Sequence, residues 1–275
     1  MSRFEVPRPD LAAALLARAR EGPPLLLTGP YGAGKTTLLR QAAEVLAREG
    51  WLPVYLDLMP AASTPERLVI AALDALPAEP FASVLLQATE IRRLAAAGRE
   101  HGAEAVRALF ALWSSLDAAS GRPVALLLDE ATEIRSLAYF SGLREAHKPF
   151  LAALRARPRG TLLATSFPTL AAKLWPDLEG FRARPLAAED LQPSLRAAGL
   201  AIDAGAVVRT SGGWPRHVSV LADRLDDGFD LETAWAEEMA PGGRLELACR
   251  HSYETLLLRS RGYGISKAVL AAVAD

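Results

Sequence analysis

The run Gly29-Pro30-Tyr31-Gly32-Ala33-Gly34-Lys35-Thr36 fits the pattern G-x-x-x-x-G-K-[ST]. It follows the apolar run Leu25–Leu27, which predicts a buried strand. After it, apolar residues recur at helical spacing up to Gly50, at Leu38, Leu39, Ala42 and Leu46. The sequence therefore predicts a strand, a glycine-rich loop and a helix in succession.

This context gives residues 29–36 a specific chemistry. Glycines let such a loop wrap tightly with its N–H groups pointing inward, at a helix N-terminus whose dipole favours anions. We expect the whole run to bind the phosphates of a nucleoside triphosphate, with Lys35 at the β- and γ-phosphates, Thr36 on Mg²⁺ and Thr37 at the α-phosphate. The alternative is a glycine-rich turn that meets the pattern by chance.

The acidic pair Asp129-Glu130 predicts the second half of this site. It follows Val124–Leu128, five apolar residues without alternation, as expected of a central strand in a parallel sheet covered on both faces. We expect Asp129 to hold the water shell of Mg²⁺ and Glu130 to activate the attacking water as a general base. Acidic pairs after apolar runs also occur as helix caps, which is the alternative.

The remaining pattern alternates strands with helices. Further strands are expected at Leu52–Leu58 and Thr161–Thr165, helices dominate from Thr64 to about residue 118, and another helix is expected from about Leu143 to Arg157. Such alternation is typical of an α/β domain with a mainly parallel sheet. From Ala187 the strand pattern disappears, so we predict a domain boundary near residues 185–190, which divides the chain into a core at residues 1–187 and helical segments at 188–243 and 244–275.

Composition excludes several classes of protein. The chain has 275 residues, 51% of them apolar, and a formal net charge of −1. This net charge gives no overall electrostatic reason to bind nucleic acid, although it does not exclude a basic patch on one face of the protein. Cys249 alone forms neither an internal disulfide nor a cysteine-rich zinc site, and the four histidines are too scattered for an HExxH-type ligand pair, so metal sites built on soft ligands are excluded. No uncharged run is longer than residues 160–172, which are too few and too polar to span a membrane, and the N-terminus lacks the apolar core of a signal peptide. We expect a cytoplasmic protein.

The sequence resembles the AAA+ and STAND branch of P-loop ATPases, most closely the prokaryotic family typified by archaeal members and related to origin-recognition and transposition ATPases. The resemblance covers about residues 4–270 and rests on the Walker A run 29–36, the Walker B run 124–130, the polar strand end Thr165-Ser166, and Gly212-Gly213-Trp214-Pro215-Arg216. It implies a five-stranded parallel sheet in the order 5-1-4-3-2, a helical lid, and ATP with Mg²⁺ as ligands.

The resemblance also implies roles for single residues. Arg8 resembles the N-terminal segment that packs beside the adenine, and Ser166, or Thr165, resembles the sensor between nucleotide and sheet. Arg216, or His217 beside it, resembles the lid residue that reaches back to the phosphates. The alternatives are a hydroxyl that caps the next turn and an ordinary arginine in the first turn of a helix.

Two arginines follow the predicted sensor strand. Arg182 and Arg184 lie where the family often places an arginine finger that acts on a neighbouring subunit, which implies self-association; ordinary surface arginines are the alternative. The long helical segment between Thr64 and Ser120 departs from the compact replication-type pattern, and this weakens any transfer of ring geometry.

The C-terminal segment predicts two helices joined at Gly262-Tyr263-Gly264, the second capped by Ser266. The pair resembles the opening helices of a winged helix. No recognition helix follows before Asp275, so either the module is incomplete or it is a different one.

The expected function is a Mg²⁺-dependent ATPase that couples hydrolysis to a conformational switch acting on a protein or DNA client. The alternative is a nucleotide-dependent switch or adaptor scaffold that does not hydrolyse ATP. A small-molecule kinase fits less well, because the helical region follows the core and does not interrupt it to close over an acceptor.

Overall fold

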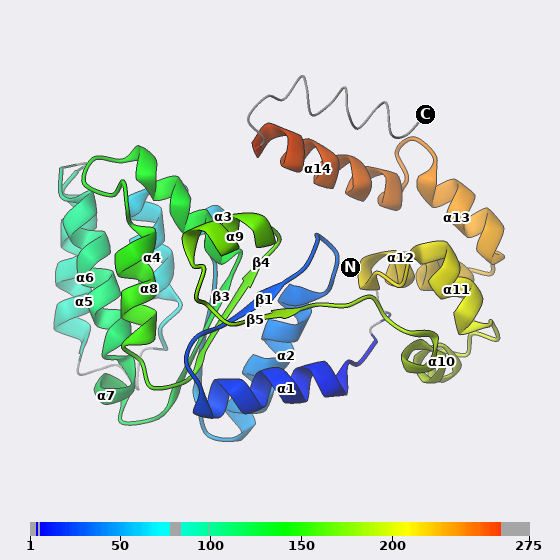
Figure 1. Ribbon diagram of the computed structural model, residues 1–275, viewed down its shortest axis with the longest axis horizontal. Helices are drawn as coiled ribbons and strands as arrows, with labels where there is room; N and C mark the ends of the chain where they lie inside the picture. The colour runs from blue at the N-terminus through cyan, green and yellow to red at the C-terminus, as the bar shows by residue number, and fades with distance from the viewer. Residues whose placement is uncertain (1–3, 5, 78–83, 99, 260–275) are drawn as a thin grey trace. The chain divides into compact units, whose positions relative to one another are not determined.

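The computed structural model describes residue 4 and residues 6–77, 84–98 and 100–259 (Figure 1). The chain forms two compact units, a first unit of residues 8–30 and 34–184 and a second unit of residues 1–7, 31–33 and 185–275. The domain boundaries expected after residues 187 and 243 stay predictions.

A five-stranded sheet forms the centre of the first unit. Its strands are β1 (Leu25–Thr28), β2 (Leu52–Asp57), β3 (Val124–Asp129), β4 (Thr161–Thr165) and β5 (Gly180–Arg182). The strands lie in the order β2-β3-β4-β1-β5 and all neighbouring pairs are parallel. Read from the other edge, this is the order 5-1-4-3-2, so the predicted sheet is confirmed.

The burial of each strand follows its position in the sheet. Every residue of β3 and β4 is buried, as expected of strands with a neighbour on each side and helices over both faces. The edge strand β2 alternates between buried and half-buried residues. At the opposite edge, β5 has only three residues and no buried one, so it carries no apolar run from which it could be predicted.

Helices cover both faces of this sheet (Figure 1). The helices of the first unit are α1 (Pro9–Glu21), α2 (Lys35–Arg48), α3 (Leu58–Ala61), α4 (Pro65–Asp74), α5 (Leu85–Ala96), α6 (Gly102–Ser114), α7 (Leu116–Ser120), the 3-10 helix η2 (Ala131–Tyr139), α8 (His147–Arg155) and α9 (Pro168–Leu174). The predicted start of a helix at Leu143 is wrong by four residues. Pro149 is the third residue of α8, and proline is tolerated only in the first turn, so α8 cannot begin earlier.

An aromatic cluster joins α6 to α8. The ring of Phe150 lies edge-on to Phe110 and Trp113, with centroids 5.7 and 6.1 Å away, and stacks on Trp175 at 5.7 Å. Beside it, the buried guanidinium of Arg157 donates to the carbonyls of Trp113 (3.2 Å) and Val124 (2.6 Å). Since β3 begins at Val124, this buried arginine anchors the amino end of the sheet and leaves the carboxyl end to the polar residues described below.

The second unit is helical throughout its described part from residue 185 to 259. Its helices are α10 (Ala188–Ala197), α11 (Ala204–Ser211), α12 (Pro215–Asp226), α13 (Leu231–Met239) and α14 (Arg244–Arg259). Buried apolar residues join the first three of them: Leu191, Leu195, Val207 and Val218. The expected helical C-terminal part is therefore confirmed, whereas the second helix of the expected winged-helix pair, capped by Ser266, lies outside the described residues.

Candidate nucleotide-binding site

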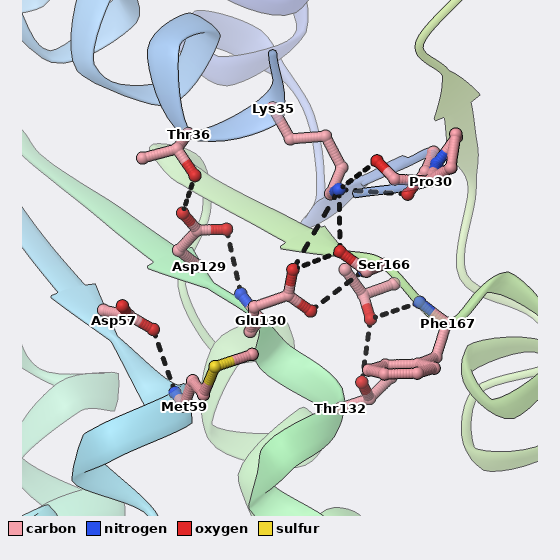
Figure 2. Close-up of polar contacts among 12 residues, drawn as sticks. Pro30, Lys35, Thr36, Asp57, Met59, Asp129, Glu130, Thr132, Ser166 and Phe167 are labelled. Atoms are coloured by element: carbon pink, nitrogen blue, oxygen red, sulfur yellow. Dashed lines mark hydrogen bonds and ion pairs between the residues drawn. The ribbon is translucent and has the colours of Figure 1, made fainter. Parts of the chain in front are cut away.

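Asp129 and Thr165, both singled out in the sequence, lie at the carboxyl ends of adjacent strands, each beside a further polar residue. In the sheet register, Thr28 at the end of β1 pairs with Thr165 at the end of β4, and Asp57 at the end of β2 pairs with Asp129 at the end of β3. Because the strands are parallel, these ends meet at one edge of the sheet, where α/β folds bind their ligands. Figure 2 shows the polar contacts at this edge.

The glycine-rich loop places the Lys35 side chain against the first residues of the same loop. Gly34, immediately before α2, has a φ of 82°, a left-handed conformation that favours glycine. The Lys35 ammonium then donates to the carbonyls of Gly29 and Pro30, both at 3.0 Å, and to the hydroxyl of Ser166 at 2.9 Å. The lysine is therefore fixed at the end of β4, although 131 positions separate it from Ser166 along the chain.

Glu130 is held by the same serine. The Ser166 N–H donates to Glu130 Oε2 at 2.9 Å, the Ser166 hydroxyl donates to Oε1, and Lys35 Nζ lies 4.0 Å from Oε1. Glu130 has a φ of 46°, and among the described residues no other non-glycine residue has a positive φ. A left-handed residue of this kind costs roughly 1–2 kcal/mol, a strain that is concentrated at functional sites.

Burial shifts the proton affinities of this pair. Lys35 is 5% exposed and Glu130 is 8% exposed. Burial raises the pKa of Glu130 above its ordinary 4.5, against hydrogen bonds from Ser166 that lower it. Burial also lowers the pKa of Lys35 below 10.5, against the attraction of Glu130 and Asp129. The Glu130 carboxylate consequently accepts a proton more readily than a solvated glutamate does.

Beside Lys35 and Glu130, the Asp129 carboxylate and two hydroxyls form a second hydrogen-bonded group of oxygen atoms. Its Oδ2 accepts a hydrogen bond from the Thr36 hydroxyl at 2.5 Å and from the Tyr55 hydroxyl at 3.1 Å, and its Oδ1 accepts one from the Glu130 N–H at 3.0 Å. Burial and the neighbouring Asp129 carboxylate raise the pKa of the Tyr55 phenol above its ordinary value. Tyr55 was not singled out in the sequence analysis; its only signal is its place on β2, two residues before Asp57.

The oxygen donors of this group fit Mg²⁺. A hydroxyl and one carboxylate are hard ligands, and Mg²⁺ is commonly held by one or two protein oxygens together with substrate phosphates and water. Within the described ranges, no group of three or more histidine, cysteine or acidic side chains could hold a metal without such help. Thr36 and Asp129 are therefore the residues that fit the ion.

Thr165 and Ser166 separate into two environments. The Thr165 hydroxyl shares a 2.7 Å hydrogen bond with that of Thr132 and accepts one from the Phe167 N–H at 3.1 Å. It thus supports the turn after β4, which is the capping alternative considered for this strand end. Ser166 alone of these two hydroxyls contacts Lys35 and Glu130.

Comparison with known families agrees with this geometry. Residues 9–165, more than half of the chain, match the family described as AAA ATPase domain. The chain belongs to this family. The resemblance stated from its motifs is thereby confirmed, and with it a nucleotide-binding AAA+ ATPase fold. No curated protein matches the chain.

Solved structures of AAA+ proteins share the fold at low identity. A Walker-type ATPase of Pyrococcus abyssi is 19% identical with a TM-score of 0.63, over 92% of this chain and 78% of that one. The ORC2 protein of Aeropyrum pernix, in its ADPNP–ADP complexes, is 16% identical with a TM-score of 0.50, over 86% of this chain and 70% of that one. These likenesses establish the fold and leave the activity to be argued from the site.

The sequence also predicted roles for Thr37, Arg8 and Arg182 of this AAA ATPase domain protein. Thr37 is exposed on α2. The guanidinium of Arg8, just before α1, donates to the carbonyl of Arg184, and Arg182 is exposed on β5, paired with Thr28. None of these contacts tests the roles expected for them.

In the second unit, which includes residues 31–33, the N–H of Arg216 donates to the Gly32 carbonyl at 3.1 Å. The ring of His217 contacts the Ser211 carbonyl at 3.1 Å. Among the described helices, none is long and apolar enough to cross a membrane. A cytoplasmic location stays a prediction.

Proposed function

We propose that this protein is an ATPase of the AAA+ and STAND type that binds ATP with Mg²⁺ and couples its hydrolysis to a conformational switch. The observation that supports this most directly is the convergence of Lys35, Ser166 and Glu130 in one hydrogen-bonded network beside Thr36 and Asp129. A turn that matched the Walker A pattern by chance would have no reason to meet two acidic residues and a hydroxyl from other strands.

In this proposal the loop binds the triphosphate. The backbone N–H groups of the loop, which Pro30 lacks, surround the phosphates. The Lys35 ammonium exchanges its contacts with the Gly29 and Pro30 carbonyls for the β- and γ-phosphates, and Thr37 contacts the α-phosphate. Arg8 packs beside the adenine. Thr36 and Asp129 would hold Mg²⁺, which would neutralise charge on the phosphate oxygens.

Hydrolysis would depend on Glu130. Its carboxylate takes a proton from the attacking water as the water oxygen bonds to the γ-phosphorus, while the bond from that phosphorus to the β–γ bridging oxygen breaks and ADP leaves with the electron pair. Its raised pKa brings its proton affinity closer to that required at neutral pH. Ser166 acts as the sensor because its N–H and hydroxyl fix both oxygens of that carboxylate. Lys35 shares the same hydroxyl and stabilises negative charge that develops on the phosphates.

The switch would act through the second unit. Arg216, or His217 beside it, is proposed to approach the γ-phosphate and so to distinguish ATP from ADP, since a ligand shifts a conformational equilibrium only by its differential affinity for the two states. Arg182 or Arg184, both exposed, is proposed to act on a neighbouring subunit after self-association. The client is a protein or DNA, and turnover measured with and without single- and double-stranded DNA separates the two.

The test of the proposed function is ATP turnover by the wild-type chain and by Glu130→Gln. We expect Mg²⁺-dependent hydrolysis by the wild type, its loss in Glu130→Gln and retention of ATP binding in both. Glu44→Gln, which neutralises an exposed carboxylate on α2, is the matched control and should hydrolyse like the wild type. Equal and undetectable hydrolysis in the wild type and Glu130→Gln, despite ATP binding, would identify a nucleotide-dependent adaptor that does not hydrolyse ATP.

A further inference from the structure

Tyr55 contacts Asp129 but has no part in the function proposed above. It lies on β2, where its backbone pairs with Leu127 of β3, two residues before the end of that strand. Its side chain reaches along the sheet edge, and the phenol donates to Asp129 Oδ2 at 3.1 Å. A half-buried tyrosine therefore touches the carboxylate that is proposed to hold Mg²⁺.

The hydrogen bonds of Asp129 show what this contact does. A carboxylate has about four acceptor positions, two on each oxygen. On Oδ2 the donors are the hydroxyls of Thr36 and Tyr55, and on Oδ1 the donor is the N–H of Glu130. The two donors on Oδ2 occupy its acceptor positions, which leaves the remaining position on Oδ1. Tyr55 therefore decides which oxygen of Asp129 can accept a further donor.

Arg40 holds the tyrosine ring in place. Its guanidinium carbon lies 5.4 Å from the centroid of the Tyr55 ring, in a cation–π contact. Arg40 is one helical turn after Thr36 on α2, so the residue that packs on the ring and the residue that donates to Asp129 belong to the same helix. The helix after the phosphate-binding loop and the edge strand β2 thus fix Asp129 jointly.

We propose that Tyr55 is a positioning residue for Mg²⁺: with its ring held by Arg40, its hydroxyl orients Asp129 so that Oδ1 faces the water shell of the ion. This inference rests on the proposed function, because it assumes that Asp129 serves the metal. Residues that hydrogen-bond to a metal-site carboxylate fix its orientation, and their loss typically lowers metal affinity about 10- to 100-fold.

The test measures metal binding directly and does not depend on turnover. Free Mn²⁺ is titrated by electron paramagnetic resonance against the full chain in the presence of ADP, and ADP affinity is measured separately with a chelator present. We expect Tyr55→Phe, which keeps the ring and its contact with Arg40, to weaken Mn²⁺ binding about 10-fold while ADP affinity with the chelator is unchanged. Tyr139→Phe removes a hydroxyl from a side chain that is 90% exposed, and it should leave both quantities unchanged.

The outcomes separate this inference from the proposed function. If the wild-type chain with ADP binds no Mn²⁺, the proposed function fails. If the wild type binds Mn²⁺ and Tyr55→Phe binds it equally well, only the role of Tyr55 is overturned. A parallel loss of ADP affinity with the chelator present would show that Tyr55 is a structural residue and would also overturn its proposed role. Should Tyr55→Phe not fold, Arg40→Gln decides: weaker Mn²⁺ binding supports the proposal and unchanged binding overturns it.

Discussion

Ser166 contacts both oxygens of the Glu130 carboxylate, with its N–H on Oε2 at 2.9 Å and its hydroxyl on Oε1. The same hydroxyl accepts a hydrogen bond from Lys35 at 2.9 Å. One serine at the end of β4 therefore sets the positions of a lysine from the helix after β1 and a glutamate from the end of β3. A change at this residue should affect the reaction more than the binding of nucleotide.

We predict that Ser166→Ala lowers kcat for ATP hydrolysis about 10- to 100-fold, since misplacing a reacting group by about 1 Å costs up to about 100-fold. The KM for ATP should change little, because Lys35 keeps its reach to the phosphates. Steady-state kinetics checks this, with Ser166→Thr as the control that retains a hydroxyl. A raised KM with an unchanged kcat would mean that Ser166 serves binding and not the orientation of Glu130.

Much of this site could be predicted because its information is local. The run 29–36 specifies its own loop geometry through glycine, and Asp129 follows an apolar run that is typical of a central strand. Parallel strands then bring their carboxyl ends together without any further signal. The sequence also pointed to the end of β4 and to Ser166 there, but it kept Thr165 as the alternative, because only the direction of each side chain separates the two.

The rest depends on contacts between distant segments. Tyr55 carries no motif, and its reach to Asp129 follows from the pairing of β2 with β3. β5 has three residues, none of them buried, and it forms by completing the edge beside β1, so no local pattern predicts it. The buried Arg157 likewise has partners far away in the sequence, and a single arginine among many gives no sign of burial.

For the phosphate site we predict that Lys35→Ala lowers ATP affinity by about one to two decades. The substitution removes a charge-assisted contact of the kind that contributes about 1.5–3 kcal/mol, while the fold survives. Binding of a fluorescent ATP analogue measures the change. Lys173→Ala, at an exposed position on α9, is the matched control. If Lys35→Ala binds ATP as tightly as the wild type does, the Walker A interpretation is wrong.

For the switch we predict that Arg216→Ala lowers hydrolysis and leaves ADP affinity nearly unchanged. The exposed Arg216 lies in the first turn of α12, and a cation there gains more from the triphosphate than from the diphosphate. Limited proteolysis by a protease of broad specificity measures the switch. The difference in cleavage near residues 185–215 between the ATP-bound and the ADP-bound protein should be smaller in Arg216→Ala than in the wild type. Arg196→Ala, at an exposed position on α10, should retain the full difference. Equal weakening of ATP and ADP would make Arg216 a structural residue.

The stability of the second unit should depend on Glu238, which joins α13 to the start of α14. Its Oε2 accepts the Arg244 N–H at 2.8 Å, its Oε1 accepts the Arg244 side chain at 3.0 Å, and Arg224 lies 3.0 Å from Oε1. Burial would raise the pKa of Glu238, but the bonds from Arg244 outweigh it and hold that pKa below the ordinary 4.5. A carboxyl whose pKa is lowered by folding stabilises the fold above the unfolded value, and this contribution is lost as pH falls through the folded one.

We therefore predict that Glu238→Gln lowers the free energy of unfolding by about 1–2 kcal/mol at neutral pH, with water screening of the partly exposed Arg244 keeping the loss moderate. The difference in the free energy of unfolding between wild type and variant should narrow as pH falls below 4.5, because protonation of Glu238 then removes from the wild type the charge that the variant lacks. Urea unfolding of both proteins from about pH 7 to about pH 3.5 measures this. Glu254→Gln, exposed on α14, should match the wild type throughout. A difference that stays constant with pH would show that Glu238 acts by shape and packing and not by its charge.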